Sequence, residues 1–180
     1  MLKDYAKGRG CRERATCVGS PFLSIIQKPT YFPLCRFLHK GKSFLGCCLA
    51  KQACKQRRSA RYVRMPDLLM ERDELAATER SDAKILKKYA RYELLVIDEW
   101  LTVEVNDVDL KFLFELIERR YMEKSTALCT QYEPAEWHEL LGGGVQADAM
   151  CDRLVHGAVR IDLGDVNVRK LLASKKESEG

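Results

Sequence analysis

The sequence lacks the long apolar segments that membrane spans and secretory signal peptides require. The longest apolar run near the N-terminus is Pro21 to Ile26. This run is far shorter than the roughly 20 residues of a transmembrane helix. It also falls short of the apolar core of a signal peptide, which needs about 7–15 residues. We therefore expect a cytoplasmic protein.

The chain has eight cysteines but no Cys-x-x-Cys pair, the spacing typical of zinc sites and thiol redox motifs. Cys47 and Cys48 are adjacent, a geometry that suits neither tetrahedral zinc nor an ordinary disulfide. Together with Cys54, Cys129 and Cys151 they lie within apolar patterns. We interpret these cysteines as buried thiols in a reducing compartment.

No internal repeat or low-complexity tract is present, so the sequence gives no sign of a repeat array. Of the 180 residues, 46% are hydrophobic and 32% are charged, as in an ordinary globular domain with a sizeable core. The formal net charge of +5 permits contact with nucleic acid but does not require it.

From Lys42 onward, strand patterns alternate with helix patterns. The predicted strands span residues 60–65, 93–98, 125–131 and 158–163. The predicted helices span residues 43–56, 67–75, 82–89, 107–122, 134–141 and 146–156. Strands that alternate with helices predict a mostly parallel sheet covered on both faces, an α/β sandwich.

Residues 1–35 do not share this alternation, because basic residues and glycines are scattered through them without a sustained period. Pro33, in the segment "PTYFPLCRF", cannot donate to the ladder of a central strand. We therefore expect residues 1–35 to be irregular and poorly ordered, and the sheet to lack a proper first strand. The abrupt change near Gly41 fits a shift of reading frame just upstream of that codon.

Gly41, Lys42 and Ser43 match the end of a phosphate-binding loop, G-x-x-x-x-G-K-[ST]. Arg36 stands where this pattern requires its first glycine. A nucleoside triphosphate site needs backbone N–H groups at a helix N-terminus, a lysine for the outer phosphates and a hydroxyl for Mg²⁺. Lys42, Ser43 and the helix that begins there supply all three.

Polar residues at the ends of the next strands extend this constellation. Asp98 ends the run "LLVID" and is placed to hold the metal, while Glu99 is placed to polarise an attacking water. An Asp-Glu pair is also typical of a plain helix-capping turn. Thr130 ends a strand and offers a hydroxyl to a γ-phosphate. Arg153 lies on a predicted helix, where most arginines are solvated or paired with a nearby acid.

Five segments carry a resemblance to a known family: "SARYVRMPDLL", "KILKKYARYELLVIDEW", "FELIERRY", "TQYEPAEWHELLGG" and "DAMCDRLVHGAVRIDL". They resemble the IstB-like transposition helper ATPases, AAA+ proteins related to the DnaC-type helicase loaders. The resemblance covers about Gly41 to Lys170. It implies a P-loop (AAA+) α/β fold, ATP and Mg²⁺ as cofactors, and action on DNA beside a transposase as a homo-oligomer.

The resemblance also implies roles for particular residues. Cofactor binding falls to the end of Walker A and the Walker B aspartate: Gly41, Lys42, Ser43 and Asp98, with Ser43 and Asp98 at the metal. Catalysis falls to the Walker B glutamate, the sensor-1 position and the arginine finger: Glu99, Thr130 and Arg153. On this basis residues 36–170 form the ATP-binding domain and residues 171–180 a charged tail.

Residues 1–40 do not match the family, and Arg36 interrupts the loop. A non-glycine residue forced into the first loop position costs about 1–2 kcal/mol, which corresponds to roughly tenfold or greater weakening of binding. The leading hypothesis is an ATP-binding helper of transposition impaired by this loop, and an ATPase only if the loop functions. The alternatives are a degenerate relative that no longer hydrolyses ATP and a DnaC-like helicase loader.

A basic stretch, "KQACKQRRSAR", begins within the first predicted helix and runs past its end. The cations that could contact DNA phosphates are Lys55, Arg57, Arg58 and Arg61. Such a cluster suits contact with DNA phosphates, and it suits a solvated helix end equally well.

Overall fold

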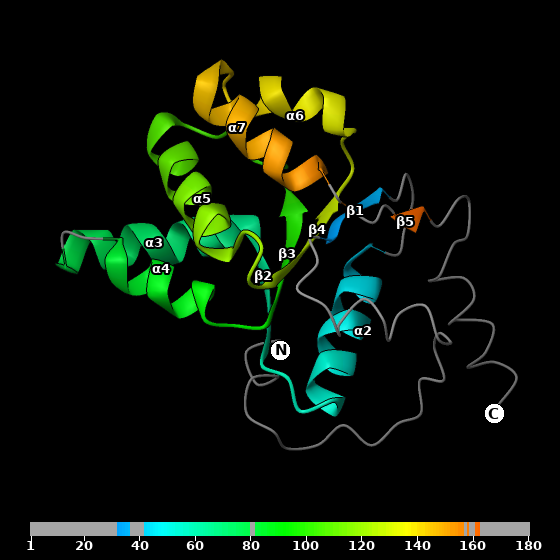
Figure 1. The fold of residues 1–180 in the computed structure, drawn as a ribbon. Coiled ribbons are helices and arrows are strands. Elements are labelled where there is room, and N and C mark those ends of the chain that lie inside the picture. The colour runs from blue at the N-terminus through cyan, green and yellow to red at the C-terminus, as the bar shows by residue number, and fades with distance from the viewer. Residues whose placement is uncertain (1–31, 37–41, 80–81, 157, 159–160, 163–180) are drawn as a thin grey trace, which may run out of the picture.

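A computed structural model of the chain describes residues 32–36, 42–79, 82–156, 158 and 161–162 (Figure 1). The sheet has five strands in the order β2-β3-β4-β1-β5, and every pair is parallel. The strands are β1 (Phe32–Arg36), β2 (Ala60–Arg64), β3 (Leu94–Trp100), β4 (Ser125–Thr130) and β5 (Ile161–Asp162). The predicted α/β architecture with a parallel sheet is therefore confirmed.

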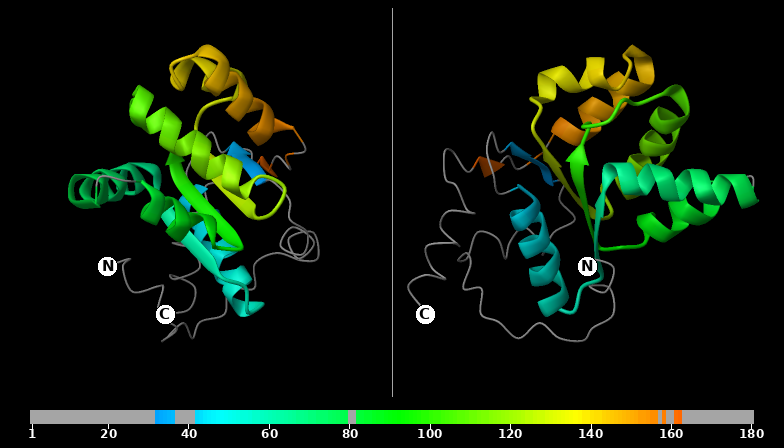
Figure 2. Two further views of the ribbon diagram at one scale, coloured as in Figure 1. Left: turned by 60° about the vertical axis from the view of Figure 1, so that its left-hand side comes forward. Right: turned by 180° about the vertical axis from the view of Figure 1, so that it is seen from behind.

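Six helices are described around this sheet within the same residues. They are α2 (Lys42–Lys55), α3 (Met65–Glu79), α4 (Ala83–Ala90), α5 (Asp107–Arg120), α6 (Pro134–Leu140) and α7 (Gly144–Val155). Figures 1 and 2 show α2 on one face of the sheet and the helices α3 to α7 on the other side. The sheet is thus sandwiched between two helical layers.

The side chains of β3 divide between the two layers. Leu94 and Val96 belong to the smaller of the two core clusters, together with Leu45, Leu49 and Ala53 of α2. Leu95 and Ile97 point the other way and belong to the larger cluster, which the helices α3 to α7 complete. This alternation, which follows from the two-residue period of a strand, places Asp98 on the same face as Leu94 and Val96. Trp100 breaks the alternation and belongs to the larger cluster, because the register shifts between Ile97 and Trp100.

Strand β1 corrects the prediction that the sheet lacks a proper first strand. It lies inside the sheet, paired on one side with β4 and on the other with β5. The register against β4 shifts between Pro33 and Cys35, where the proline has no N–H to give to a ladder. The strand accommodates Pro33 by this irregularity, and the segment predicted to be irregular, 1–35, therefore ends inside β1.

Helix α3 begins at Met65, two residues before the predicted start. Pro66 does end strand β2, but it also occupies the first turn of the helix, where its missing N–H would have no partner in any case. Helix α5 begins where predicted, because the Asn106 side chain accepts hydrogen bonds from the backbone N–H groups of Val108 and Asp109.

The burial predicted for the cysteines is right for Cys129 and wrong for Cys54, which is exposed. Cys47, Cys48 and Cys151 are partly buried. Within the described part of the chain, no helix combines the length and the apolar character needed to cross a bilayer.

Candidate functional site

Lys42 and Asp98 lie close together at the carboxyl edge of the sheet. Lys42 is the first residue of α2, and Asp98 continues the series of β3 residues that faces this helix. Burial lowers the pKa of the Lys42 ammonium, and the negative charge of Asp98 opposes that shift. The structure therefore brings together the lysine and the aspartate that the sequence singled out.

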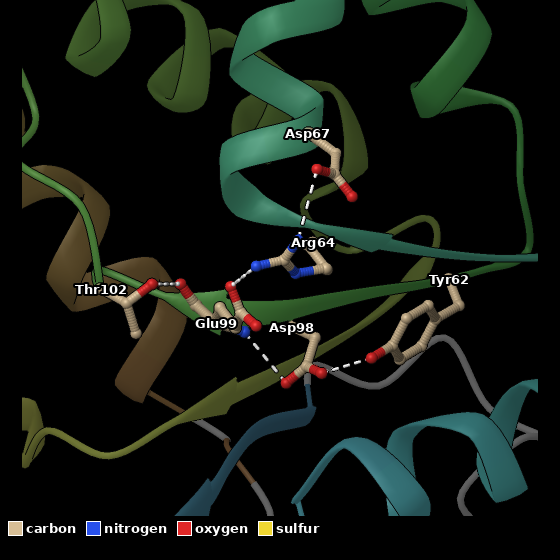
Figure 3. Close-up of polar contacts among 6 residues, drawn as sticks. All are labelled: Tyr62, Arg64, Asp67, Asp98, Glu99 and Thr102. Atoms are coloured by element: carbon tan, nitrogen blue, oxygen red, sulfur yellow. Dashed lines mark hydrogen bonds and ion pairs between the residues drawn. The ribbon is translucent and has the colours of Figure 1, made fainter. Parts of the chain in front are cut away.

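The Asp98 carboxylate is 3% exposed and both of its oxygens accept hydrogen bonds. The backbone N–H of Glu99 donates to Oδ1 over 2.9 Å, and the hydroxyl of Tyr62, on the neighbouring strand β2, donates to Oδ2 (Figure 3). A buried carboxylate that accepts a hydrogen bond on each oxygen keeps a fixed orientation. Asp98 is thus set in place before any ligand binds.

Glu99 leaves the strand pattern. Its backbone φ of 56° lies in the left-handed region, which costs a residue with a side chain about 1–2 kcal/mol. The register between β3 and β4 shifts between Ile97 and Trp100, so the strand bends at this point. Strain of this kind at a carboxylate beside a buried aspartate is typical of a functional position.

The Glu99 carboxylate is held by Arg64, the last residue of β2. The guanidinium of Arg64 donates to Glu99 Oε2 over 2.5 Å and lies 3.6 Å from Asp67 of α3 (Figure 3). The pKa of the Arg64 guanidinium is raised, and the hydrogen bond to Glu99 is the largest cause. Both side chains remain partly exposed, so a ligand at this edge can reach Glu99.

Gly46 allows α2 to lie close to the sheet. A Cβ at this position would stand 3.0 Å from Val96 Cγ1 and 3.1 Å from Cys129 Sγ. These distances are shorter than ordinary van der Waals contacts, so a larger residue would push the helix away from the sheet. Gly46 therefore keeps Lys42 and Ser43 near Asp98, a role that its position early in a helical pattern did not reveal.

Thr130, at the end of β4, is 1% exposed and its hydroxyl is engaged twice. It donates to the backbone carbonyl of Trp100 over 3.0 Å and accepts from the backbone N–H of Tyr132 over 3.1 Å. Its single proton is therefore used within the protein. In this arrangement Thr130 ties the end of β4 to the end of β3.

We expect Thr130→Val to lower the free energy of unfolding by about 1–3 kcal/mol, because it leaves a buried carbonyl and a buried N–H without their partner. Thr130→Ser retains the hydroxyl and should lose much less. Chemical denaturation of the two variants measures the difference. Equal stability of the valine and serine variants would show that these hydrogen bonds contribute nothing.

Arg153, on α7, is held by residues of α5 in the same chain. Its Nε lies 2.7 Å from Glu118 Oε2, and its guanidinium lies over the rings of Phe114 and Tyr121, at 5.4 Å and 5.8 Å from their centroids. It also donates to the carbonyl of Ala149 over 2.8 Å. The side chain is 28% exposed, so it is partly covered but reaches the surface.

The family model described as IstB-like ATP binding protein matches residues 36–176. This chain belongs to the IstB-like family. The match begins at the last residue of β1 and includes every helix and strand that follows in the described structure.

Curated relatives of this IstB-like chain come from several bacteria. An insertion sequence ATP-binding protein of Sinorhizobium fredii is 37% identical over 130 residues, which is 72% of this chain and 53% of the relative. The insertion sequence IS232 ATP-binding protein of Bacillus thuringiensis subsp. berliner is 32% identical over 123 residues, 68% of this chain and 49% of that protein. The chain thus spans about half the length of these relatives.

Solved structures share the fold of this IstB-like chain. The DnaC helicase loader superposes with a TM-score of 0.63 at 15% identity, over 78% of this chain and 85% of that one. DnaA from Aquifex aeolicus, bound to AMPPCP, gives 0.66 at 18% identity, over 87% of this chain and 49% of that one. The chain therefore has the AAA+ P-loop fold.

The IstB-like fold places the remaining predicted site residues as follows. Ser43 is exposed in the first turn of α2, beside Lys42. Gly41 lies outside the described residues, and Arg36 is the last residue of β1. Four of the predicted site residues lie together at the carboxyl edge of the sheet: Lys42, Ser43, Asp98 and Glu99. The side chains of Thr130 and Arg153 are held by the intrachain partners given above.

Sequence reasoning missed the three polar partners of these residues, Tyr62, Arg64 and Glu118. The signal for the first two was the parallel pairing of β2 with β3, which sets Arg64 opposite Asp98 and Tyr62 opposite Val96. The contact of Glu118 with Arg153 depends on the packing of α7 on α5, and no local sequence pattern indicates that packing.

The basic stretch lies at the other edge of the sheet from Lys42. Lys55 ends α2 and Arg57 is exposed in the turn that follows, with a φ of 60°. Arg58 pairs with Glu93 over 3.7 Å, at the amino end of β3. Any polyanion bound by these cations is therefore separated from the Lys42 site by the length of α2, about 20 Å.

Proposed function

We propose that this chain is an ATP-binding helper protein of DNA transposition, which acts on DNA together with a transposase. The observation that carries the proposal is the meeting of Lys42 and Asp98 at the carboxyl edge of a parallel sheet, in a chain of the IstB-like family. Ligands of open parallel sheets bind at that edge. The insertion sequence relatives described above supply the link to transposition.

Nucleotide binding follows from the first turn of α2. Backbone N–H groups at a helix N-terminus attract phosphate, and the Lys42 ammonium neutralises the outer phosphates. The Ser43 hydroxyl and the Asp98 carboxylate are hard oxygen donors of the kind that Mg²⁺ prefers, and both lie beside Tyr62, so the residues present fit the ion. Bound there, Mg²⁺ would neutralise phosphate charge. Arg36 in place of the first loop glycine weakens the binding.

Hydrolysis would depend on Glu99 and Arg153. Glu99 stands next to Asp98 and accepts a proton from the attacking water once Arg64 no longer holds its carboxylate. Arg153, on α7, matches the arginine finger of the family and would reach the nucleotide of a neighbouring copy, so that a homo-oligomer on DNA would be the active form. Thr130 contributes by fixing the end of β4 against that of β3.

A second candidate function is a binding-only relative that holds ATP without hydrolysing it. Two contacts favour it, because Arg64 holds Glu99 and Glu118 holds Arg153 within the chain. Steady-state ATP turnover on DNA separates the two candidates. A third candidate function, a helicase loader, rests on the fold shared with DnaC. If a transposase stimulates ATP hydrolysis and a helicase does not, this third candidate is wrong.

We expect Lys42→Ala to weaken ATP binding by roughly 10- to 100-fold, because a charge-assisted hydrogen bond to phosphate contributes about 1.5–3 kcal/mol. Titration with a fluorescent ATP analogue measures the loss. The matched control is Lys55→Ala, which removes the same charge at the far end of the same helix and should leave affinity unchanged. Equal affinity of wild type and Lys42→Ala would show that the phosphate-loop assignment is wrong.

A further inference from the structure

Tyr62 stands between helix α2 and strand β3, at the point where the candidate metal ligands meet. Its hydroxyl donates to Asp98 Oδ2. Burial raises the pKa of this hydroxyl, and the nearby Ser43 side chain opposes that rise. Its ring lies against Gly46, where an added Cβ would be 3.4 Å from Tyr62 Cε2. The phenol thus donates to one of the oxygen donors proposed for Mg²⁺, Asp98, and lies near the other, Ser43.

The two hydrogen bonds of Asp98 differ in what they contribute. The bond from the Glu99 N–H comes from the adjacent residue of the same strand, so it fixes only the local turn of the carboxylate. The bond from Tyr62 comes from β2 and therefore links Asp98 to a different strand. Since Tyr62 also lies near Ser43 on α2, it connects the three elements that define the site.

The Tyr62 hydroxyl acts as a hydrogen-bond donor to Asp98. Burial raises the pKa of Tyr62 well above its usual value, and the hydrogen bond to Asp98 and the Asp98 charge raise it further. The Cys47 thiol, one turn along α2, lies beside the same hydroxyl, and its pKa is raised by burial and by Asp98.

We propose that Tyr62 is a positioning residue that fixes Asp98 relative to Ser43, and that it thereby sets the Mg²⁺ affinity of the nucleotide site. The inference rests on the proposed function and adds to it a residue outside the phosphate-loop and strand-end motifs. Groups that orient metal ligands by hydrogen bonding typically contribute 10- to 100-fold to metal affinity. Tyr62 acts through Asp98 and Ser43 and does not contact the nucleotide.

The experiment compares Tyr62→Phe with wild type. The phenylalanine keeps the ring that packs against Gly46 and removes only the hydroxyl. The binding of a fluorescent ATP analogue is followed while Mg²⁺ is titrated, and separately in EDTA. We expect the Mg²⁺ concentration at half-maximal binding to rise about tenfold. Affinity in EDTA should stay at the wild-type value, because Lys42 and the α2 N-terminus are unchanged.

Tyr89→Phe is the matched control. Tyr89 also donates its hydroxyl to a carboxylate, Glu71 Oε2, over 2.7 Å, but it does so between α4 and α3, away from the carboxyl edge. This variant loses a hydrogen bond of the same kind and should keep the wild-type Mg²⁺ midpoint. Thermal unfolding of both variants confirms that each is folded during the titration.

Any one of four results would overturn the proposal. The first is an unchanged or lowered Mg²⁺ midpoint in Tyr62→Phe, and the second is an equal rise in Tyr89→Phe, which would indicate a general loss of stability. The third is a wild-type chain that binds the analogue without any response to Mg²⁺, which removes the metal site itself. A wild-type chain that binds no analogue in EDTA or in Mg²⁺ overturns the nucleotide proposal as well.

Discussion

ATP turnover on DNA should fall about 10³-fold or more when Arg153 is replaced by alanine. An arginine that reaches a neighbour's nucleotide stabilises the charge that develops on the transferred phosphoryl group, and such residues contribute about 10³–10⁵ to the rate. Folding should change little, because a partly exposed ion pair and its ring contacts contribute only about 1 kcal/mol. The measurement is the ATPase rate per subunit of the wild type and of Arg153→Ala, followed as the protein concentration rises.

The action of Arg153 on a neighbouring subunit can be tested by mixing two inactive variants. Arg153→Ala keeps an intact nucleotide site, and Lys42→Ala keeps an intact arginine. If Arg153 acts on the neighbouring nucleotide, a mixture of the two forms some competent pairs and recovers activity that neither variant has alone. No recovery, or a wild-type rate per subunit that is independent of protein concentration, would contradict action between subunits.

Glu118→Gln is the control for this prediction. Glu118 holds Arg153 over 2.7 Å, so in the isolated chain the arginine is engaged by α5. The substitution removes the charge of the partner and keeps Arg153 itself. We expect turnover to be retained or increased, since the arginine leaves α5 more readily. A loss as large as that of Arg153→Ala would mean that the pair, rather than the arginine, is required.

The sequence predicted the middle of the fold well because its periodicities are strong. The continuous apolar run before Asp98 can only be a strand buried on both faces, and it became β3. The amphipathic stretch after Asn106 became α5, at almost the predicted ends. In these segments local pattern and tertiary packing favour the same structure.

Strand β1 was not predictable in the same way. Pro33 argues against a central strand on local grounds, and the preceding residues show no period. The strand forms because β4 and β5 offer ladders on both sides, with a register shift that absorbs the proline. Such a pairing depends on residues about a hundred positions further along the chain, so the local pattern could not indicate it.

Some residues of the candidate site could also be predicted from the sequence, and others could not. Lys42 and Asp98 could be predicted to meet, because a helix that follows one strand and the end of another share one edge of a parallel sheet. Tyr62, Arg64 and Glu118 could not, since each acts through a side chain whose partner is set by strand register or helix packing. The proposed ligands could be found from the sequence, whereas the residues proposed to orient them could not.

Arg120→Met should lower the free energy of unfolding by about 3–5 kcal/mol, because several buried oxygens each lose a hydrogen bond from a charged donor. Arg120 ends α5 and is fully buried. Its guanidinium donates to the carbonyls of Tyr89, Ala90, Tyr92 and Ser125, and its Nε donates to the Thr126 hydroxyl over 2.9 Å. Tyr89 and Ala90 are the last residues of α4, whose final carbonyls have no partner within the helix.

The large cost arises because methionine fills most of the space but donates nothing, so several buried carbonyl oxygens lose their hydrogen bonds at once. Arg119→Met, at the next position, is the matched control. Arg119 is exposed and pairs only with Glu115 among the contacts described for it, over 2.6 Å and one turn away, so its loss should cost less than about 0.5 kcal/mol. Urea denaturation of the two variants gives both values. If Arg120→Met were no less stable than Arg119→Met, the junction of α4, α5 and β4 would not depend on the buried guanidinium.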